Sequence, residues 1–265
     1  MEKKSEIMEQ PKQSFSMALT ESLNEVSSAL PVGFNTTRFV QNAVALLNEN
    51  TQLADFARKN GTGQIKQGMM KAAYLGLDFM NKEAYLIPFG TTLNFMIDYK
   101  GNTKLAKEHS IRPIKDIYAK LVRNGDEFQE NIVNGEPSID FKPLPFNNDE
   151  IIGAFAVCLF DDGGMIYDSM SVADMENTRK SSKMANGPTW KNFTGEMYKK
   201  TVLHRLCKTI EISFDNPQQS KYFNEDMEIE TDQQKIVENE VAENQCSEEF
   251  VVDSEVADAE PDFAK

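Results

Sequence analysis

The sequence predicts an α+β protein, and three observations lead to this class. Apolar residues recur at helical spacing through the first seventy positions, two short apolar strands face each other across Gly90, and residues 151–160 form one continuous apolar run. With 40% hydrophobic and 26% charged residues, the composition is that of an ordinary soluble globular chain. We therefore expect N-terminal helices, a small and mainly antiparallel sheet with helices packed on it, and a disordered acidic C-terminal tail.

Charge and hydrophobicity divide the chain into three expected segments. Residues 1–12 are polar and predict a flexible N-terminal arm, whereas residues 13–220 carry the apolar patterns of the folded domain. Residues 221–265 hold 15 acidic and 3 basic residues with few large apolar clusters, which predicts disorder. This tail carries −12 of the formal net charge of −14, so the rest of the chain is nearly neutral and its cations can gather on one surface.

Three helices are expected before the first strand. Apolar spacing places them at about 14–30, from 36 towards 55, and at 64–74, and Pro31 ends the first of them. Their apolar stripes suit either the core or a contact between neighbouring subunits.

The glycines of residues 61–68 have the spacing of a phosphate-binding loop. That loop needs a lysine followed by serine or threonine, which reach the terminal phosphates and a magnesium ion. Met69 and Met70 stand at those two positions. The segment therefore predicts the start of a helix, and no nucleotide cofactor is expected.

The first candidate site is the joint between the second strand, which is expected to run through Tyr99-Lys100-Gly101, and the helix that follows it. Gly101 would let a ligand approach the backbone, and the helix start offers N–H groups that suit an anion. At 3.6 residues per turn, Lys100, Lys104 and Lys107 fall on one face. This pattern favours a phosphate group, although any exposed helix after a glycine joint has similar residues.

The sheet is expected from residues 114–167. A strand pair is predicted around 114–122 with a turn at 124–126, short extended pieces follow to 141, and the central strand at 151–160 turns back at 161–164. Asp161 and Asp162 lie in that last turn. A hairpin turn rich in aspartate and glycine is commoner than a metal site, so no metal is expected.

The second candidate site combines a basic segment and the helix expected from 188 to about 210. Ser171 is expected to cap a short helix through Met175. Residues 177–183, which follow it, are rich in cations and hydroxyls, which are common phosphate contacts. One face of the helix then gathers cations, hydroxyls and rings: Trp190, Lys191, Thr194, Tyr198, Thr201, Arg205 and Lys208. This mixture is typical of a groove that holds a single strand by its backbone while bases stack on rings. The alternatives are a solvated loop and an ordinary amphipathic helix with its rings in the core.

Short motifs in a consistent order between residues 30 and 215 resemble the RecT family of phage single-strand DNA annealing proteins. The matching pieces are Gly76-Leu77-Asp78, Ala84-Tyr85-Leu86-Ile87-Pro88-Phe89, Asp98-Tyr99-Lys100-Gly101 with Leu105-Ala106, Gly153-Ala154-Phe155-Ala156-Val157, Met170-Ser171, Trp190, Glu196-Met197, Lys200-Thr201 and Arg205-Leu206. Phe79-Met80 depart from the proline-bearing turn expected in the family. The resemblance implies ATP-independent pairing of complementary strands during homologous recombination, without enzymatic chemistry, by an oligomer that forms rings or helical filaments.

The two candidate sites and the resemblance together give one predicted DNA-binding set. Its members are Tyr99, Lys100, Gly101, Lys104, Lys107, Arg179, Lys180, Ser182, Lys183, Lys191, Thr194, Tyr198, Arg205 and Lys208. The expected partners are single-stranded DNA, the annealed duplex and further copies of the chain. The C-terminal part is a candidate contact for a partner exonuclease or a host single-strand-binding protein.

The expected compartment is the cytoplasm, because no window approaches the length of an apolar membrane span and no signal peptide is evident. Cys158, Cys207 and Cys246 are odd in number and far apart, so reduced thiols are expected, the first two in the core. Two other functions are open: a metal-dependent nuclease, and a structural filament protein with incidental DNA affinity. The only histidines, His109 and His204, lack close metal-ligand neighbours, which weighs against the nuclease.

Overall fold

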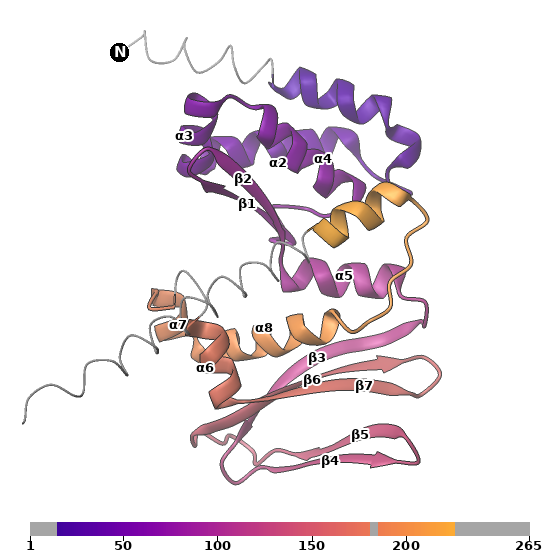
Figure 1. Cartoon of the computed structure of the whole chain (residues 1–265), viewed down its shortest axis with the longest axis vertical. Coiled ribbons are helices and arrows are strands. Elements are labelled where there is room, and N and C mark those ends of the chain that lie inside the picture. Colours follow the sequence, from indigo (N-terminus) through magenta and orange to yellow (C-terminus); the bar gives the residue numbers. More distant parts are fainter. Residues whose placement is uncertain (1–14, 181–184, 226–265) are drawn as a thin grey trace, which may run out of the picture. The chain divides into compact units, whose positions relative to one another are not determined.

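The computed structural model describes residues 15–180 and 185–225, and it confirms the predicted α+β class (Figure 1). Helices lead into a two-stranded hairpin, and a three-stranded antiparallel sheet with a second hairpin follows. The expected arm at 1–12 and nearly all of the expected tail lie outside the described residues. Within the described ranges, no helix combines the length and the apolar character that crossing a membrane requires.

The N-terminal helices follow the predicted order, but the first ends at residue 25, where an end at about 30 was predicted. A helix over 15–25 precedes the short 3-10 turn η1 (Ser27–Ala29), and then come α2 (Thr36–Glu49), α3 (Thr51–Asn60) and α4 (Gly63–Tyr74).

A second difference is the break at Asn50, where a single helix from 36 towards 55 was predicted. The Asn50 backbone N–H donates to the Leu46 carbonyl, while its side-chain oxygen accepts from the Leu53 N–H at 3.1 Å. Asparagine therefore ends one helix and begins the next, a position for which its short polar side chain suits it.

The hairpin of β1 (Ala84–Phe89) and β2 (Thr92–Ile97) packs on these helices. Leu86 and Phe95 from the strands share one buried cluster with Ile65 and Met69 from α4. The apolar stripes of the N-terminal helices thus lie in the core, which was one of the two interpretations open from the sequence.

Helix α5 (Tyr99–His109) begins earlier than expected. Strand β2 ends at Ile97 and Asp98 is the N-cap of the helix, so the predicted extension of the strand through Tyr99-Lys100-Gly101 is wrong. Lys100 and Gly101 instead lie in the first helical turn.

The three-stranded sheet has the order β3-β6-β7, made of β3 (Ile114–Arg123), β6 (Ile151–Phe160) and β7 (Met165–Ser171). The prediction of a central strand at 151–160 is confirmed, and its continuous apolar run has a clear cause. Phe155 and Val157 belong to the cluster shared with the second hairpin, whereas Ala154 and Ala156 belong to the cluster shared with α8 (Thr194–Cys207). Both faces are covered, so neither face of β6 needs polar residues.

The second hairpin consists of β4 (Glu127–Val133) and β5 (Glu136–Lys142), which pair only with each other. The predicted pairing of the two strands on either side of the 124–126 turn is therefore wrong, because β4 pairs with β5 and not with β3. The Asp126 carboxylate accepts from the backbone N–H groups of Arg123, at the end of β3, and of Leu144, after β5. It thus joins the two ends of the second hairpin to the end of β3. Phe128 and Phe141 then pack on the Phe155 ring, at centroid distances of 5.1 and 5.0 Å. Strand β3 pairs with β6 instead.

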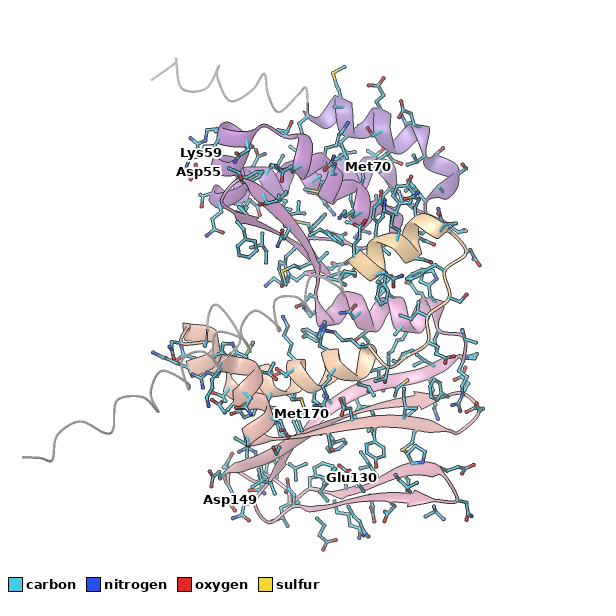
Figure 2. All side chains as sticks on the ribbon, viewed as in Figure 1. Asp55, Lys59, Met70, Glu130, Asp149 and Met170 are labelled. Carbon is cyan, nitrogen blue, oxygen red and sulfur yellow. The ribbon has the colours of Figure 1, made fainter. Side chains whose placement is uncertain are left out.

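On the other face of the sheet lie α6 (Val172–Lys180), α7 (Pro188–Asn192) and α8 (Figure 2). Ser171 caps α6 as predicted: its hydroxyl accepts from the Asp174 N–H at 3.2 Å, and the Asp174 carboxylate accepts from the Ser171 N–H in return. Met170, labelled in Figure 2, belongs to the buried cluster that joins β7 to α8.

Two boundaries in this part differ from the prediction. Helix α6 continues to Lys180, so Arg179 and Lys180 lie on a helix rather than in a loop. The single helix expected from 188 to 210 is broken at Phe193, whose φ of −132° and ψ of 40° are not helical.

The cysteine prediction is confirmed for the two thiols that the structure describes. Cys158 and Cys207 are both buried, and burial raises the pKa of each thiol to about 11. Cys246 lies outside the described residues.

The chain continues as a helix over 217–225 that packs on the N-terminal part. Tyr222 meets Tyr74 edge to face, and the Lys71 ammonium pairs with the Glu225 carboxylate at 2.7 Å. These contacts place residues 221–225 with the folded part, five residues beyond the boundary expected at 220.

Candidate nucleic-acid interface

Helices α5 and α8 lie side by side and run in the same direction. Asn102 Nδ2 lies 3.0 Å from His204 Nδ1, and the Thr103 hydroxyl lies 3.9 Å from Cys207 Sγ. Since the contact partners advance together along both helices, the two N-terminal ends lie at the same edge (Figure 1). The positive ends of both helix dipoles therefore point to one side.

An ion pair with α8 holds the start of α5. Asp98 is the N-cap but makes no side-chain cap hydrogen bond, because its carboxylate pairs with the Lys200 ammonium. The Asp98 side chain is only 4% exposed. Lys200 also lies over the Tyr99 ring, 5.6 Å from its centroid, so this one lysine joins α8 to the start of α5.

Packing explains why residue 101 is a glycine, and the sequence did not reveal this reason. Gly101 is buried, and a Cβ atom on it would fall on the carbonyl oxygen of Glu83 and 2.7 Å from Ile97 Cγ2. The missing side chain thus serves the packing of α5 against the start of β1, which is a correction to the expectation that it makes room for a ligand.

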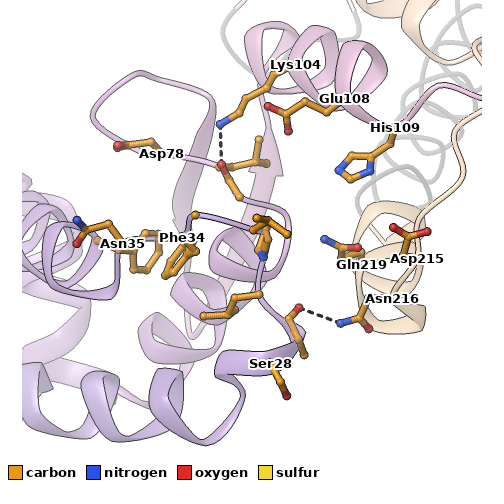
Figure 3. A pocket seen from close by; sticks show the side chains of 18 of the residues that line it. Ser28, Phe34, Asn35, Asp78, Lys104, Glu108, His109, Asp215, Asn216 and Gln219 are labelled. Carbon is orange, nitrogen blue, oxygen red and sulfur yellow. Dashed lines mark hydrogen bonds between the residues drawn. The ribbon is translucent and has the colours of Figure 1, made fainter. Parts of the chain in front are cut away.

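Lys104 and Lys107 have partners within the chain. The Lys104 ammonium donates to the Gly76 carbonyl at 2.7 Å and to the Glu83 carboxylate at 3.1 Å (Figure 3). Glu83 also accepts from the Asp78 N–H at 2.8 Å, so Lys104 fastens the 76–78 segment to α5. The Lys107 ammonium pairs with Asp116 at 3.0 Å.

Arg179 and Arg205 also pair with carboxylates. Arg179 lies 3.3 Å from Glu176 and donates to the Ala185 carbonyl at 2.8 Å, which ties the end of α6 to the segment before α7. Its guanidinium lies 5.6 Å from the centroid of the Trp190 ring. Arg205 pairs with Asp168 on β7. A phosphate would compete with a carboxylate at each of these two positions.

The rings of Trp190 and Tyr198 lie in the core, 5% and 4% exposed. The Tyr198 hydroxyl donates to Glu176, and burial together with this hydrogen bond raises the pKa of Tyr198 to about 12. The same hydrogen bond lowers the pKa of the Glu176 carboxyl. Of the two interpretations left open from the sequence, the structure supports the core position, and neither ring is presented for stacking.

The break at Phe193 explains why the predicted helical face is not continuous. A helical wheel drawn across 188–210 assumes one unbroken helix, whereas α7 and α8 have different axes (Figure 1). The Thr194 hydroxyl donates to the Trp190 carbonyl at 2.7 Å and is used in this junction. Lys208 is half-buried at the end of α8, and Ser182 and Lys183 lie outside the described residues.

Several described cations have no carboxylate partner in the described part of the chain. Lys59, Lys115 and Lys120 are on α3 and β3, whereas three others lie on helices that contact α8. Lys100 lies in the first turn of α5, Lys180 in the last turn of α6 and Lys191 on α7, and all three are exposed. Lys82 is exposed as well. It precedes Glu83, whose carbonyl oxygen lies against Gly101 in the first turn of α5. We call the surface formed by these four residues the lysine edge.

Lys82 and Lys200 are not among the residues predicted from the sequence. Lys200 stands in one of the matching motifs, Lys200-Thr201, and that was the available signal for it. Lys82 has a left-handed backbone, with a φ of 58°, and only the pairing of Glu83 with Asp98 across the hairpin brings it to the start of α5.

A cavity of about 900 Å³ lies away from this edge, between the 28–35 segment, the 76–78 segment and the C-terminal end of α5 (Figure 3). Its charged lining residues have both signs: Arg38 and Lys104 are cationic, and Asp78, Glu108 and Asp215 are anionic. Arg38 and Asp78 already pair at 3.1 Å. Such a balanced lining does not favour a polyanion.

The described residues contain no group of three or more histidine, cysteine, aspartate or glutamate side chains placed to hold a metal ion. Asp162, one of the two aspartates in the 161–164 turn, accepts two hydrogen bonds from Arg112 at 2.9 and 2.7 Å. These bonds lower the pKa of its carboxyl and stabilise the turn.

Comparison with known proteins agrees with the motifs. The family model described as the RecT family matches residues 37–239. Protein RecT of Escherichia coli (strain K12) is 26% identical over 201 residues, which cover 72% of this chain and 72% of that protein. The match spans both halves of the candidate interface, α5 as well as α6 to α8. The chain therefore belongs to the RecT family, a family of DNA recombination and annealing proteins.

Proposed function

We propose that this protein binds single-stranded DNA and pairs complementary strands during homologous recombination, without a nucleotide cofactor. The observation that carries the proposal is the lysine edge. Four exposed lysines without carboxylate partners in the described part of the chain lie just before β1, in the first turn of α5, and on α6 and α7, the two helices beside α8. Family membership supports the same function.

The proposed mechanism is positional. Lys82, Lys100, Lys180 and Lys191 hold the sugar-phosphate backbone, and the base edges stay free to test a second strand. No side chain performs covalent chemistry. One edge of this size covers few nucleotides, so adjacent subunits would have to align their edges to stabilise a new duplex, and a ring or helical filament of copies provides that alignment.

The direct test is annealing without ATP. Two complementary oligonucleotides carrying a fluorophore and a quencher should pair faster with the protein than without it, and a non-complementary pair should show no quenching. An unchanged pairing rate overturns the proposal. Shortened oligonucleotides in the presence of magnesium would favour a nuclease instead, and filaments that never pair strands would favour a structural protein.

The lysine edge predicts a particular salt dependence. Lys100→Ala and Lys191→Ala should each weaken binding by a similar factor for every sequence, and each should reduce the slope of log affinity against log salt by about 0.7, as expected for one lost phosphate contact on a single strand. Fluorescence anisotropy at several salt concentrations measures this slope.

The matched control for this experiment is Lys120→Ala on β3. Lys120 is also exposed and has no carboxylate partner among the described residues, but it lies on β3, outside the lysine edge. It removes the same charge and should leave the slope nearly unchanged. Equal losses in all three variants would mean that net charge, and not the edge, determines the affinity.

Deleting residues 227–265 should strengthen DNA binding. The deletion removes 13 acidic and 2 basic residues, so the net charge of the protein becomes less negative by 11 and repulsion of the phosphates falls. The cut follows Asp226 because Tyr222 and Glu225 contact the folded part. The gain in affinity should shrink at high salt. A weaker affinity after the deletion would place the tail within the binding surface.

A further inference from the structure

An exposed aromatic ring lies at the junction of α7 and α8. The side chain of Phe193 is exposed, with 60% of the residue surface accessible, although Trp190 and Tyr198 on either side of it in the sequence are buried. A single exposed apolar side chain is common on protein surfaces, so exposure alone assigns nothing. Its backbone and its charged surroundings distinguish this one.

The backbone of Phe193 is firmly held. Its carbonyl accepts from the Met197 N–H at 3.0 Å, and the adjacent Thr194 hydroxyl donates to the Trp190 carbonyl at 2.7 Å. Behind it, the rings of Trp190 and Tyr198 meet edge to face, with their centroids 6.4 Å apart. The exposed ring is therefore attached to a junction anchored by two buried aromatic side chains, and presenting it to a ligand costs little ordering entropy.

Cations lie on the elements beside the ring, together with Glu196 in the first turn of α8, which pairs with Lys199 at 2.6 Å. Lys191 is two residues before it on α7, and the Arg179 hydrogen bond to the Ala185 carbonyl holds the end of α6, with Lys180, close to the start of α7. Two members of the lysine edge therefore flank the junction that carries Phe193. A ring for the face of a base, beside cations for the phosphates, is the combination that binds single strands without sequence preference.

We propose that Phe193 is a base-stacking residue of the lysine edge. This inference rests on the proposed function, because it assigns to the same surface the contact that holds the bases. Stacking uses the face of a base and leaves its pairing edge open, so a strand held in this way stays ready to pair. The stacking surface is thus the exposed ring in the α7–α8 junction, and not the rings of Trp190 and Tyr198 that the helical pattern indicated.

The test compares two strands of equal length, an oligothymidylate and an abasic oligonucleotide that keeps the phosphates but has no bases. Phe193→Leu keeps an apolar side chain and removes the ring. It should weaken oligothymidylate binding by about fivefold to a hundredfold, the range measured for losing one stacked base, and leave binding of the abasic strand unchanged. Phe146→Leu is the matched control, because Phe146 is 99% exposed in the connection between β5 and β6. It should change neither affinity.

The possible outcomes separate the two proposals. A wild-type protein that binds neither strand overturns the proposed function and the stacking role together. Wild-type binding that is unaffected by Phe193→Leu overturns the stacking role and leaves the function standing. An equal loss on both strands assigns the ring to folding or to assembly, and also overturns stacking. Thermal midpoint and sedimentation of the variant identify which of those two applies.

Discussion

Replacing Lys200 by methionine is expected to lower the free energy of unfolding by about 3 kcal/mol, the lower end of the range for breaking a buried ion pair. Methionine keeps the apolar stem but removes the charge, which leaves the Asp98 carboxylate, 4% exposed, without its ion-pair partner. The lower end applies because the Lys200 side chain is 39% exposed and part of the pair is already hydrated. Denaturant unfolding followed by circular dichroism measures the change.

A double-mutant cycle provides the control. Asp98→Asn combined with Lys200→Met removes both charges, so no buried charge is left unpaired and most of the lost stability should return. A double variant that loses the sum of the two single effects would show that the pair contributes no coupling. Asp98→Asn alone should cost less than Lys200→Met, because the partly exposed ammonium can turn to water.

Gly101→Ala should destabilise the protein by about 1–3 kcal/mol, the usual cost of forcing a methyl group into a filled space. The new Cβ would fall on the Glu83 carbonyl oxygen, a backbone atom that also accepts from the Asp98 N–H at 2.9 Å and cannot move alone. Alanine is otherwise favoured over glycine in a helix by about 1 kcal/mol, so the sign of the result is informative. The shift in thermal midpoint measures it.

Gly63→Ala is the matched variant for this comparison. Gly63 is the first residue of α4, has an ordinary helical backbone, and no atom lies within 4 Å of the Cβ that alanine would add. This substitution should be neutral or mildly stabilising. If Gly101→Ala behaves in the same way, α5 can move away from β1 at no cost, and the packing reason given for Gly101 is wrong.

The elements that the sequence predicted well are those whose pattern is local. Strand β6 is recognisable from an unbroken apolar run, and the β1–β2 hairpin from two apolar segments separated by Gly90. The N-terminal cap of α6 is formed by Ser171 and Asp174, which are only three residues apart. Each of these features depends on residues that are neighbours along the chain.

The features that the sequence did not predict depend on distant partners. Nothing near β3 indicates that it pairs with β6, which begins almost thirty residues after it ends. The phase of the apolar residues around 188–210 is compatible with one helix, and only the packing of Trp190 and Tyr198 in one core reveals the break at Phe193.

The candidate site shows the same limit in its charges. Helical spacing correctly places cations on α5, but it cannot show which of them already have carboxylate partners. Glu83, which pairs with Lys104, is 21 positions away along the chain, and Asp168, which pairs with Arg205, is 37 positions away. Lys100 remains exposed at the helix start, whereas Lys104 is committed to holding the 76–78 segment.

The parallel pairing of α5 with α8 has a consequence for how the protein is made. Asn102 and His204 are separated by 102 positions, and the whole sheet is synthesised between them. Contacts of such long separation form late, since the chain between them must be ordered first. The N-terminal helices and the β1–β2 hairpin can fold on the ribosome well before α8 emerges. A growing chain therefore has its first core long before α5 and α8 can pair, and the surface that these two helices form together is complete only after translation has passed Cys207.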